Sequence, residues 1–259
     1  MSSFSQKVCL KCGQYPAAGN QLRRCGSCLA VKYCSSACQT EDWASHRLVC
    51  KNVGAARKEE LMPLMLAARN GDVATVERLL KAGAKVDGGA LLNDDEAAII
   101  FTPLLMAATA GHAAVIAVLL KAGAKLNRAT TRSCTPLFAA AQEGHRAAVT
   151  VLIEAGADVD ILADEELTPL YVAAARGHEA VLALLIKAGA DVNRTKDNGC
   201  TPLFIAAARG HEVVLLALLK AGAQMTATDD GHTPLMAATN GGHTVVVAAL
   251  RQWIANIRD

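Results

Sequence analysis

Aromatic side chains are scarce in this sequence. Phe, Trp and Tyr make up 3% of 259 residues, although 52% of the residues are hydrophobic and the mean hydropathy is +0.25. A core dominated by stacked rings is therefore excluded, and Ala, Leu and Val must supply the buried surface. The chain is long and apolar enough to form more than one folding unit.

Several motifs of export and catalysis are also missing. The first residues, Met1–Lys7, contain no apolar segment and no signal-like cleavage site, so we expect a protein kept in a reducing intracellular compartment, cytoplasmic or nuclear. The sequence has no nucleophile elbow, no phosphate-binding loop and no dinucleotide fingerprint. We therefore expect that the protein is not an enzyme.

One uncharged run is long enough to cross a bilayer. It covers the 24 residues from Ala97 to Leu120. It contains Pro103, Gly111 and His112, and its pattern recurs downstream in pieces that charged residues interrupt. We interpret it as part of a buried repeat, and we expect no membrane association.

Charge is divided unevenly along the chain. Residues 1–60 hold nine Lys or Arg against four Asp or Glu, a balance of +5, whereas the remainder holds 17 against 20, a balance of −3. Such an asymmetry suggests two domains with different partners.

Seven of the nine cysteines lie between positions 9 and 50, and they form closely spaced pairs with one histidine. The pairs are Cys9 and Cys12, Cys25 and Cys28, Cys34 and Cys38, and His46 and Cys50. Eight donors make two tetrahedral sites with no open position, which is typical of structural zinc. A disulfide framework fits poorly because seven is an odd number and no export signal precedes it, and a redox motif would need a βαβ pattern that is absent. We predict that binding of two Zn²⁺ supplies most of the folding free energy of this segment.

The segment Tyr33–Gln39, followed by Asp42, Trp43, His46 and Cys50, resembles the MYND zinc finger. The resemblance implies interleaved ligands: Cys9, Cys12, Cys34 and Cys38 at one ion, and Cys25, Cys28, His46 and Cys50 at the other. It also implies a shallow groove for a short proline-containing peptide, to which Gln39 and Trp43 contribute. Trp43 is equally well explained as a core residue of a small domain, and Gly26 stands where some peptide-binding members have a polar residue.

A nucleic-acid role for this basic finger is the alternative function. The finger carries Arg23, Arg24, Lys32, Arg47 and Lys51. Its spacing does not fit a finger with a groove-reading helix, so solvated surface charge explains these residues better.

The remainder of the chain is periodic. Thr-Pro-Leu begins at Thr102, Thr135, Thr168, Thr201 and Thr233, at intervals of 33, 33, 33 and 32 residues. Each period continues with an alanine-rich stretch, a Gly-His pair, an apolar stretch and a Gly-Ala pair. Thr is a helix N-cap, Pro is favoured at the first helical position, and Gly allows the left-handed residue that ends a helix. The pattern therefore predicts two short helices in each repeat.

These repeats resemble the ankyrin repeat, over nearly all of residues 61–259. We count six, the first of which has Met62-Pro63 in place of Thr-Pro. Pro63 and Pro103 are 40 residues apart, seven more than the period, so we predict an enlarged loop at residues 88–100. The family histidine after Thr-Pro-Leu is replaced by Leu105, Phe138, Tyr171, Phe204 and Met236. We favour a buried row at this position over a partly exposed apolar strip.

Two other recurring residue types have structural explanations. One histidine recurs in each of the last five repeats (His112, His145, His178, His211 and His243), and stacked helices lie too far apart for these rings to meet at one metal ion. Cys134 and Cys200 are two repeats apart, which is too far for a disulfide.

The predicted fold is thus mostly α: a MYND finger (1–52), a linker (53–60) and an ankyrin-repeat solenoid (61–259). By resemblance, the concave side of the array binds a second protein through turn tips and first-helix ends. The candidate contacts are Thr131, Arg132, Gln142, Glu143, Asp164, Glu165, Arg176, Asp197, Asn198, Arg209, Asp229 and Asn240. We expect a monomeric adaptor protein. It remains open whether the finger binds a peptide or only caps the array.

Overall fold

The structure is a computed structural model that describes residues 63–88, 90–91, 100–130 and 133–258, together with residues 23–24 and 32–33. The chain divides into two compact units. One comprises Met1–Pro63 with Leu91–Ala98, and the other comprises Leu64–Ala90 with Ile99–Asp259. Within the described residues, no helix has the length and apolar character needed to span a membrane.

The structure describes two short strand pairs. β1 (Arg23–Arg24) pairs antiparallel with β2 (Lys32–Tyr33), with Arg23 opposite Tyr33 and Arg24 opposite Lys32. β3 (Ala90–Leu91) and β4 (Ile100–Phe101) form a second two-stranded sheet. These last two strands lie at the ends of the predicted enlarged loop, and residues 92–99 between them lie outside the described residues.

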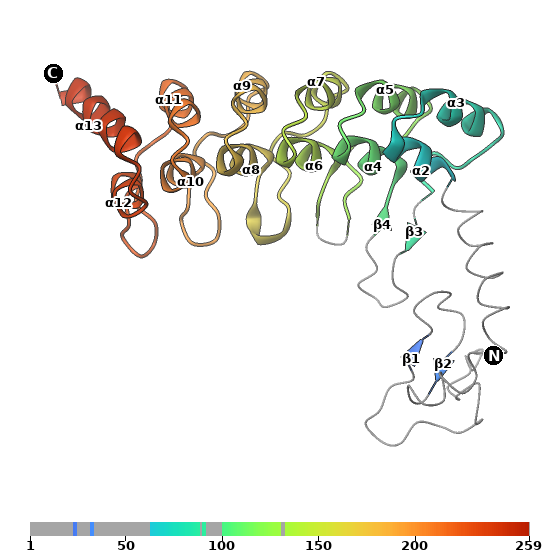
Figure 1. The fold of residues 1–259 in the computed structure, drawn as a ribbon, viewed down its shortest axis with the longest axis horizontal. Helices are drawn as coiled ribbons and strands as arrows, with labels where there is room; N and C mark the ends of the chain where they lie inside the picture. Colours follow the sequence, from blue (N-terminus) through green and yellow to red (C-terminus); the bar gives the residue numbers. More distant parts are fainter. Residues whose placement is uncertain are drawn as a thin grey trace. The chain divides into compact units, whose positions relative to one another are not determined.

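Six helix pairs make up the repeat unit, and its first and second helices form two rows (Figure 1). The pairs are α2 (Pro63–Asn70) and α3 (Val73–Lys81), α4 (Pro103–Thr109) and α5 (Ala113–Lys121), α6 (Pro136–Gln142) and α7 (Arg146–Glu154), α8 (Pro169–Arg176) and α9 (Glu179–Lys187), α10 (Pro202–Arg209) and α11 (Glu212–Lys220), and α12 (Pro234–Asn240) and α13 (Thr244–Arg258). The predicted repeat pattern is confirmed.

The first helices begin where the Thr-Pro-Leu tripeptides predict. Each threonine hydroxyl accepts a hydrogen bond from the backbone N–H three residues later, at 3.1 to 3.2 Å. Four of these five threonines are at most 2% exposed. A cap of this kind stabilises a helix by about 1 kcal/mol, and Pro at the first position loses no hydrogen bond.

Glycines follow the first helices of all six repeats and the second helices of the first five. Gly177 and Gly210 are left-handed residues (φ 75° and 76°) directly after α8 and α10. Gly156 lies two residues after α7 and is also left-handed (φ 87°). A side chain would make this conformation costly, which explains why glycine recurs here.

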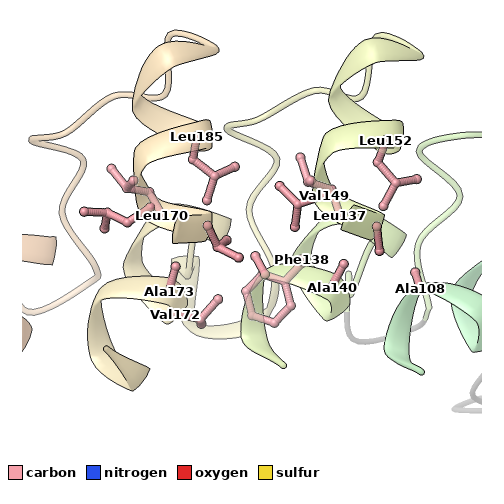
Figure 2. Packing of buried hydrophobic residues seen from close by; sticks show 14 of the residues in the cluster. Ala108, Leu137, Phe138, Ala140, Val149, Leu152, Leu170, Val172, Ala173 and Leu185 are labelled. Carbon is pink, nitrogen blue, oxygen red and sulfur yellow. The ribbon is translucent and has the colours of Figure 1, made fainter. Parts of the chain in front are cut away.

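The core is aliphatic, as the lack of aromatic residues predicts. Leucines such as Leu137, Leu152, Leu170 and Leu185 are completely or almost completely buried between successive repeats (Figure 2). Buried alanines on the first helices let neighbouring helices approach closely.

The residues that replace the family histidine do not form a uniformly buried row, so the core interpretation was wrong for part of it. Leu105 and Phe138 are buried, Tyr171 and Phe204 are half-buried, and Met236 is 46% exposed. Figure 2 shows Phe138 beside Val172 of the next repeat. In the repeat that follows Phe204, the position of Val172 is held by the smaller Ala237. The described residues provide no further repeat to cover Met236. Burial at this position therefore decreases along the array.

Candidate protein-interaction surface

The recurring histidines join consecutive repeats. Each precedes a second helix, and its ring Nε2 lies 2.9 to 3.1 Å from a backbone oxygen of the preceding repeat. The pairs are His112 with Arg69, His145 with Thr109, His178 with Gln142, His211 with Ala175, and His243 with Ala208. The histidines are structural, as the sequence predicts, and this set of contacts is called the histidine ladder below.

The ladder also explains the glycine before the histidine in repeats two to five. A Cβ atom built on Gly144 would lie 2.7 Å from the His178 ring, and Gly111 and Gly177 are equally close to the histidine of the following repeat. These glycines have φ of 75° to 79°. Glycine is therefore required both by the backbone and by the ring that packs on it.

Asp and Asn side chains form a second ladder. Each accepts a hydrogen bond from a backbone N–H of the next repeat: Asp87 from Lys125 (3.0 Å), Asn127 from Asp158 (3.4 Å), Asp160 from Asp191 (3.2 Å) and Asn193 from Gln224 (2.8 Å). Two polar ladders and an aliphatic core thus hold the repeats in register, and most of the regularly spaced residues serve this purpose.

The two downstream cysteines are free. Burial raises the pKa of the Cys134 thiol to about 11, with a contribution from the negative charge of Asp164. Burial also raises the pKa of Cys200. Protonated thiols are poor nucleophiles, so neither residue is suited to covalent chemistry at neutral pH.

The candidate contacts that the structure describes lie at the predicted turns and first-helix ends. Glu143, Asp164, Arg176, Asp197, Asn198, Arg209, Asp229 and Asn240 are exposed. Gln142 is half-buried, its side chain donates to Glu143 at 3.0 Å, and its carbonyl group takes part in the histidine ladder. Thr131, Arg132 and the side chain of Glu165 lie outside the described residues.

Opposite charges gather at opposite ends of the first helices. The turns before α8, α10 and α12 contain six acidic residues (Asp164, Glu165, Glu166, Asp197, Asp229 and Asp230) against Arg194 and Lys196. A hydrogen bond with Asp197 and the charge of that carboxylate raise the pKa of Glu166. At the other end, Arg176 and Arg209 are the last residues of α8 and α10. Arg176 lies 3.8 Å from Glu143, an exposed ion pair that contributes little to stability.

Two features of this surface are not apparent from any single turn or helix of the sequence. Ser133 and Glu166 are left-handed (φ 51° and 56°) at the turn position that is Gly199 in the following repeat, so alignment of the turns could have revealed them. The exposure of Phe204 and Met236 depends on the next repeat and has no local signal.

The predicted zinc ligands and peptide-binding residues lie outside the described residues. In the part of the chain that the structure does describe, no group of three or more His, Cys, Asp or Glu residues could hold a metal ion. The donor set itself, seven thiolates and one imidazole, is one that zinc prefers. β1 ends directly before Cys25, β2 ends directly before Cys34, and Cys28 belongs to the segment between them.

Comparison with known families agrees with both parts of this description. The family model for ankyrin repeats matches residues 35–130, 64–163, 129–196 and 170–258. The chain belongs to the ankyrin-repeat family. The family model for the MYND finger matches residues 9–50, so a MYND finger precedes the repeats. A MYND finger implies zinc binding, and both families mediate interactions between proteins.

Two curated proteins share short similar segments. SET domain and MYND-type zinc finger protein 6 of Schizosaccharomyces pombe is 39% identical over 41 residues, which is 16% of this chain and 8% of that protein. Tudor domain-containing protein 1 of Homo sapiens is 40% identical over 46 residues, which is 18% of this chain and 4% of that protein. The chain thus spans only a small part of these relatives, and the similarity says nothing about the rest of them.

Proposed function

We propose that this protein is a non-catalytic intracellular adaptor that acts as a monomer and holds two protein partners at once. The finger (residues 1–52) binds one partner and the ankyrin array (61–259) binds the other, with residues 53–60 as the linker. The observation that carries the proposal is the division of labour in the array. The repeated residues are used for capping, stacking and the two ladders, whereas the exposed turn and helix-end residues are not needed for these and change along the array, as from Glu143 to Arg176 at the same helix-end position.

In this proposal the finger holds two structural Zn²⁺ ions. Cys9, Cys12, Cys34 and Cys38 bind one, and Cys25, Cys28, His46 and Cys50 bind the other. The metal supplies folding free energy and no chemistry. Gln39 and Trp43 contribute to a groove for a short proline-containing peptide.

Two separable sites predict two separable losses of partners. Cross-linking and affinity capture from source cells should be compared for the wild-type chain, a finger variant (Cys34→Ser) and an array variant (Arg176→Glu with Arg209→Glu). Each variant should lose a different set of proteins. Lys187→Glu with Lys220→Glu changes the net charge equally on the second helices and is the matched control. Loss of the same proteins from both variants, or from neither, contradicts a two-site adaptor.

Nucleic-acid association through the basic finger is the remaining alternative, and only the charge count favours it. It predicts that retained nucleic acid falls steeply with salt concentration.

A further inference from the structure

The surface of repeats four to six has a polarity that restricts what it can bind. Along α8 and α10, each first helix begins next to an acidic turn and ends in an arginine. The turns project from the first helices on the side away from the second helices (Figure 1). We call Glu166, Asp197 and Asp229 the acidic row, and Arg176 and Arg209 the arginine row.

Apolar side chains lie between these two rows. Phe204 and Ile205 in the first turn of α10 are half-buried, and Met236 in the first turn of α12 is 46% exposed. Tyr171 and Ile205 pack against the core, whereas Phe204 and Met236 are not part of that cluster. Phe204 and Met236 therefore present apolar surface that a partner side chain could cover.

The carboxylates of the acidic row lie close to one another, and Arg194 offsets only part of the repulsion at Glu166. Asp229 follows the same turn pattern as Asp197, and its backbone N–H donates to the Asn198 carbonyl at 3.2 Å, so adjacent acidic turns are held close together. The raised pKa of Glu166 has the same origin, because the Asp197 carboxylate is its neighbour. Cationic groups of a partner would relieve this repulsion.

Resting on the proposed function that the array binds a protein, we infer that its partner presents an amphipathic helix laid across the first helices of repeats four to six, with Lys or Arg along one edge of its apolar stripe and Asp or Glu along the other. The basic edge meets the acidic row, the apolar stripe meets Phe204 and Met236, and the acidic edge meets the arginine row. The rows run from repeat to repeat over roughly 20 to 30 Å in three repeats, which is the length of a helix of several turns. Each row needs partner groups along one continuous edge, and a helix provides such edges.

Three synthetic helical peptides of about 18 residues test the inference, since a helix rises about 1.5 Å per residue. All share the same apolar stripe. The split-edge peptide has Lys on one edge and Glu on the other. The mixed-edge peptide has the same composition but alternates Lys and Glu on both edges. The double-basic peptide has Lys on both edges. Binding to the full-length protein is measured by isothermal titration calorimetry.

The split-edge peptide should bind the wild-type chain at least about fivefold more tightly than the mixed-edge peptide, a difference that two exposed ion pairs can supply. Arg176→Glu with Arg209→Glu makes both rows acidic, so this variant should prefer the double-basic peptide. Lys187→Glu with Lys220→Glu has the same charge change on the second helices and should keep the wild-type preference.

Four results overturn the inference. The first three are no binding of the split-edge peptide, equal binding of the split-edge and mixed-edge peptides, and a preference that the arginine substitutions leave unchanged. A wild-type preference for the double-basic peptide also overturns it, because the acidic row would then act alone. The proposed adaptor function survives these outcomes if the array variant still loses its own set of cellular partners in the capture experiment.

Discussion

At the scale of single residues, glycine serves two different purposes in the array. Gly144 and Gly156 are both left-handed, with φ of 76° and 87°. A Cβ atom on Gly144 would meet the His178 ring at 2.7 Å, whereas nothing lies within 4 Å of a Cβ atom on Gly156. A side chain at either glycine would strain the backbone, but only a side chain at Gly144 would also collide with a neighbouring ring.

We therefore expect Gly144→Ala to lower the free energy of unfolding more than Gly156→Ala. The backbone term is about 1–2 kcal/mol for both, and displacement of the histidine adds to it only at Gly144. Urea unfolding followed by circular dichroism provides the measurement. Equal losses of unfolding free energy in the two variants would show that the His178 ring can move aside without destabilising the fold.

Glu166 predicts a pH-dependent effect on stability. Asp197 raises the pKa of the Glu166 carboxyl group, so this group stays protonated to a higher pH in the folded chain than in the unfolded chain. The contribution of protonated Glu166 to the stability of the fold is therefore fully present below its unfolded pKa and is lost as the pH rises through its folded pKa. Glu166→Gln should increase stability at pH 7 and change it little at acidic pH. High salt should reduce the gain.

Thermal unfolding at pH 4 and pH 7 measures this difference. Glu179→Gln, on the exposed start of α9, serves as the control for loss of one negative charge elsewhere. A gain from Glu166→Gln of the same size at both pH values argues against the repulsion.

At the scale of helices, the buried threonine caps fix where each repeat begins. Thr168 is 1% exposed, and its hydroxyl accepts the Tyr171 N–H at 3.1 Å. Thr168→Val keeps the shape but leaves that N–H without its acceptor, so we expect a loss of about 1–2 kcal/mol in denaturant unfolding. Thr168→Ser retains the acceptor and should lose clearly less. Equal losses would assign the effect to packing instead of capping.

The sequence was sufficient to predict the helices because their signals are local. Thr-Pro begins a first helix, Gly-His separates the two helices, and Gly-Ala follows the second, so this spacing predicted where the helices of the Thr-Pro-Leu repeats lie. Burial at the position of Phe138 and Met236 is not local, because it depends on the residue that the next repeat places against it. The separation of acidic turns from arginines at the helix ends can be predicted from the sequence only after the turns and the helix ends are recognised as separate rows.

At the scale of the whole molecule, the two units should respond differently to metal removal. The repeat unit has its own aliphatic core and two ladders, and we propose that the finger depends on zinc for its folding. Purified protein should contain about two zinc ions per chain, as two four-donor sites require. A strong chelator should release them while the helical circular dichroism signal of the array persists.

Elemental analysis and circular dichroism before and after chelation test this expectation. A metal-free protein that is fully folded would exclude zinc-dependent folding of the finger. Loss of the helical signal would instead support the view that the finger caps the first repeat.

The histidine ladder has a consequence for how such a chain can change length. Its donors and acceptors are 36 residues apart in three of the five steps, 35 in the last and 43 in the first, where the enlarged loop intervenes, yet the contact is 2.9 to 3.1 Å in every case. The acceptor is always a main-chain oxygen, which any residue supplies. Excision of one whole period, such as Thr168 to Cys200, would therefore let His211 take the place of His178 at Gln142. Gene duplication or loss of single modules could remodel the binding surface without leaving an orphaned polar group at the new junction.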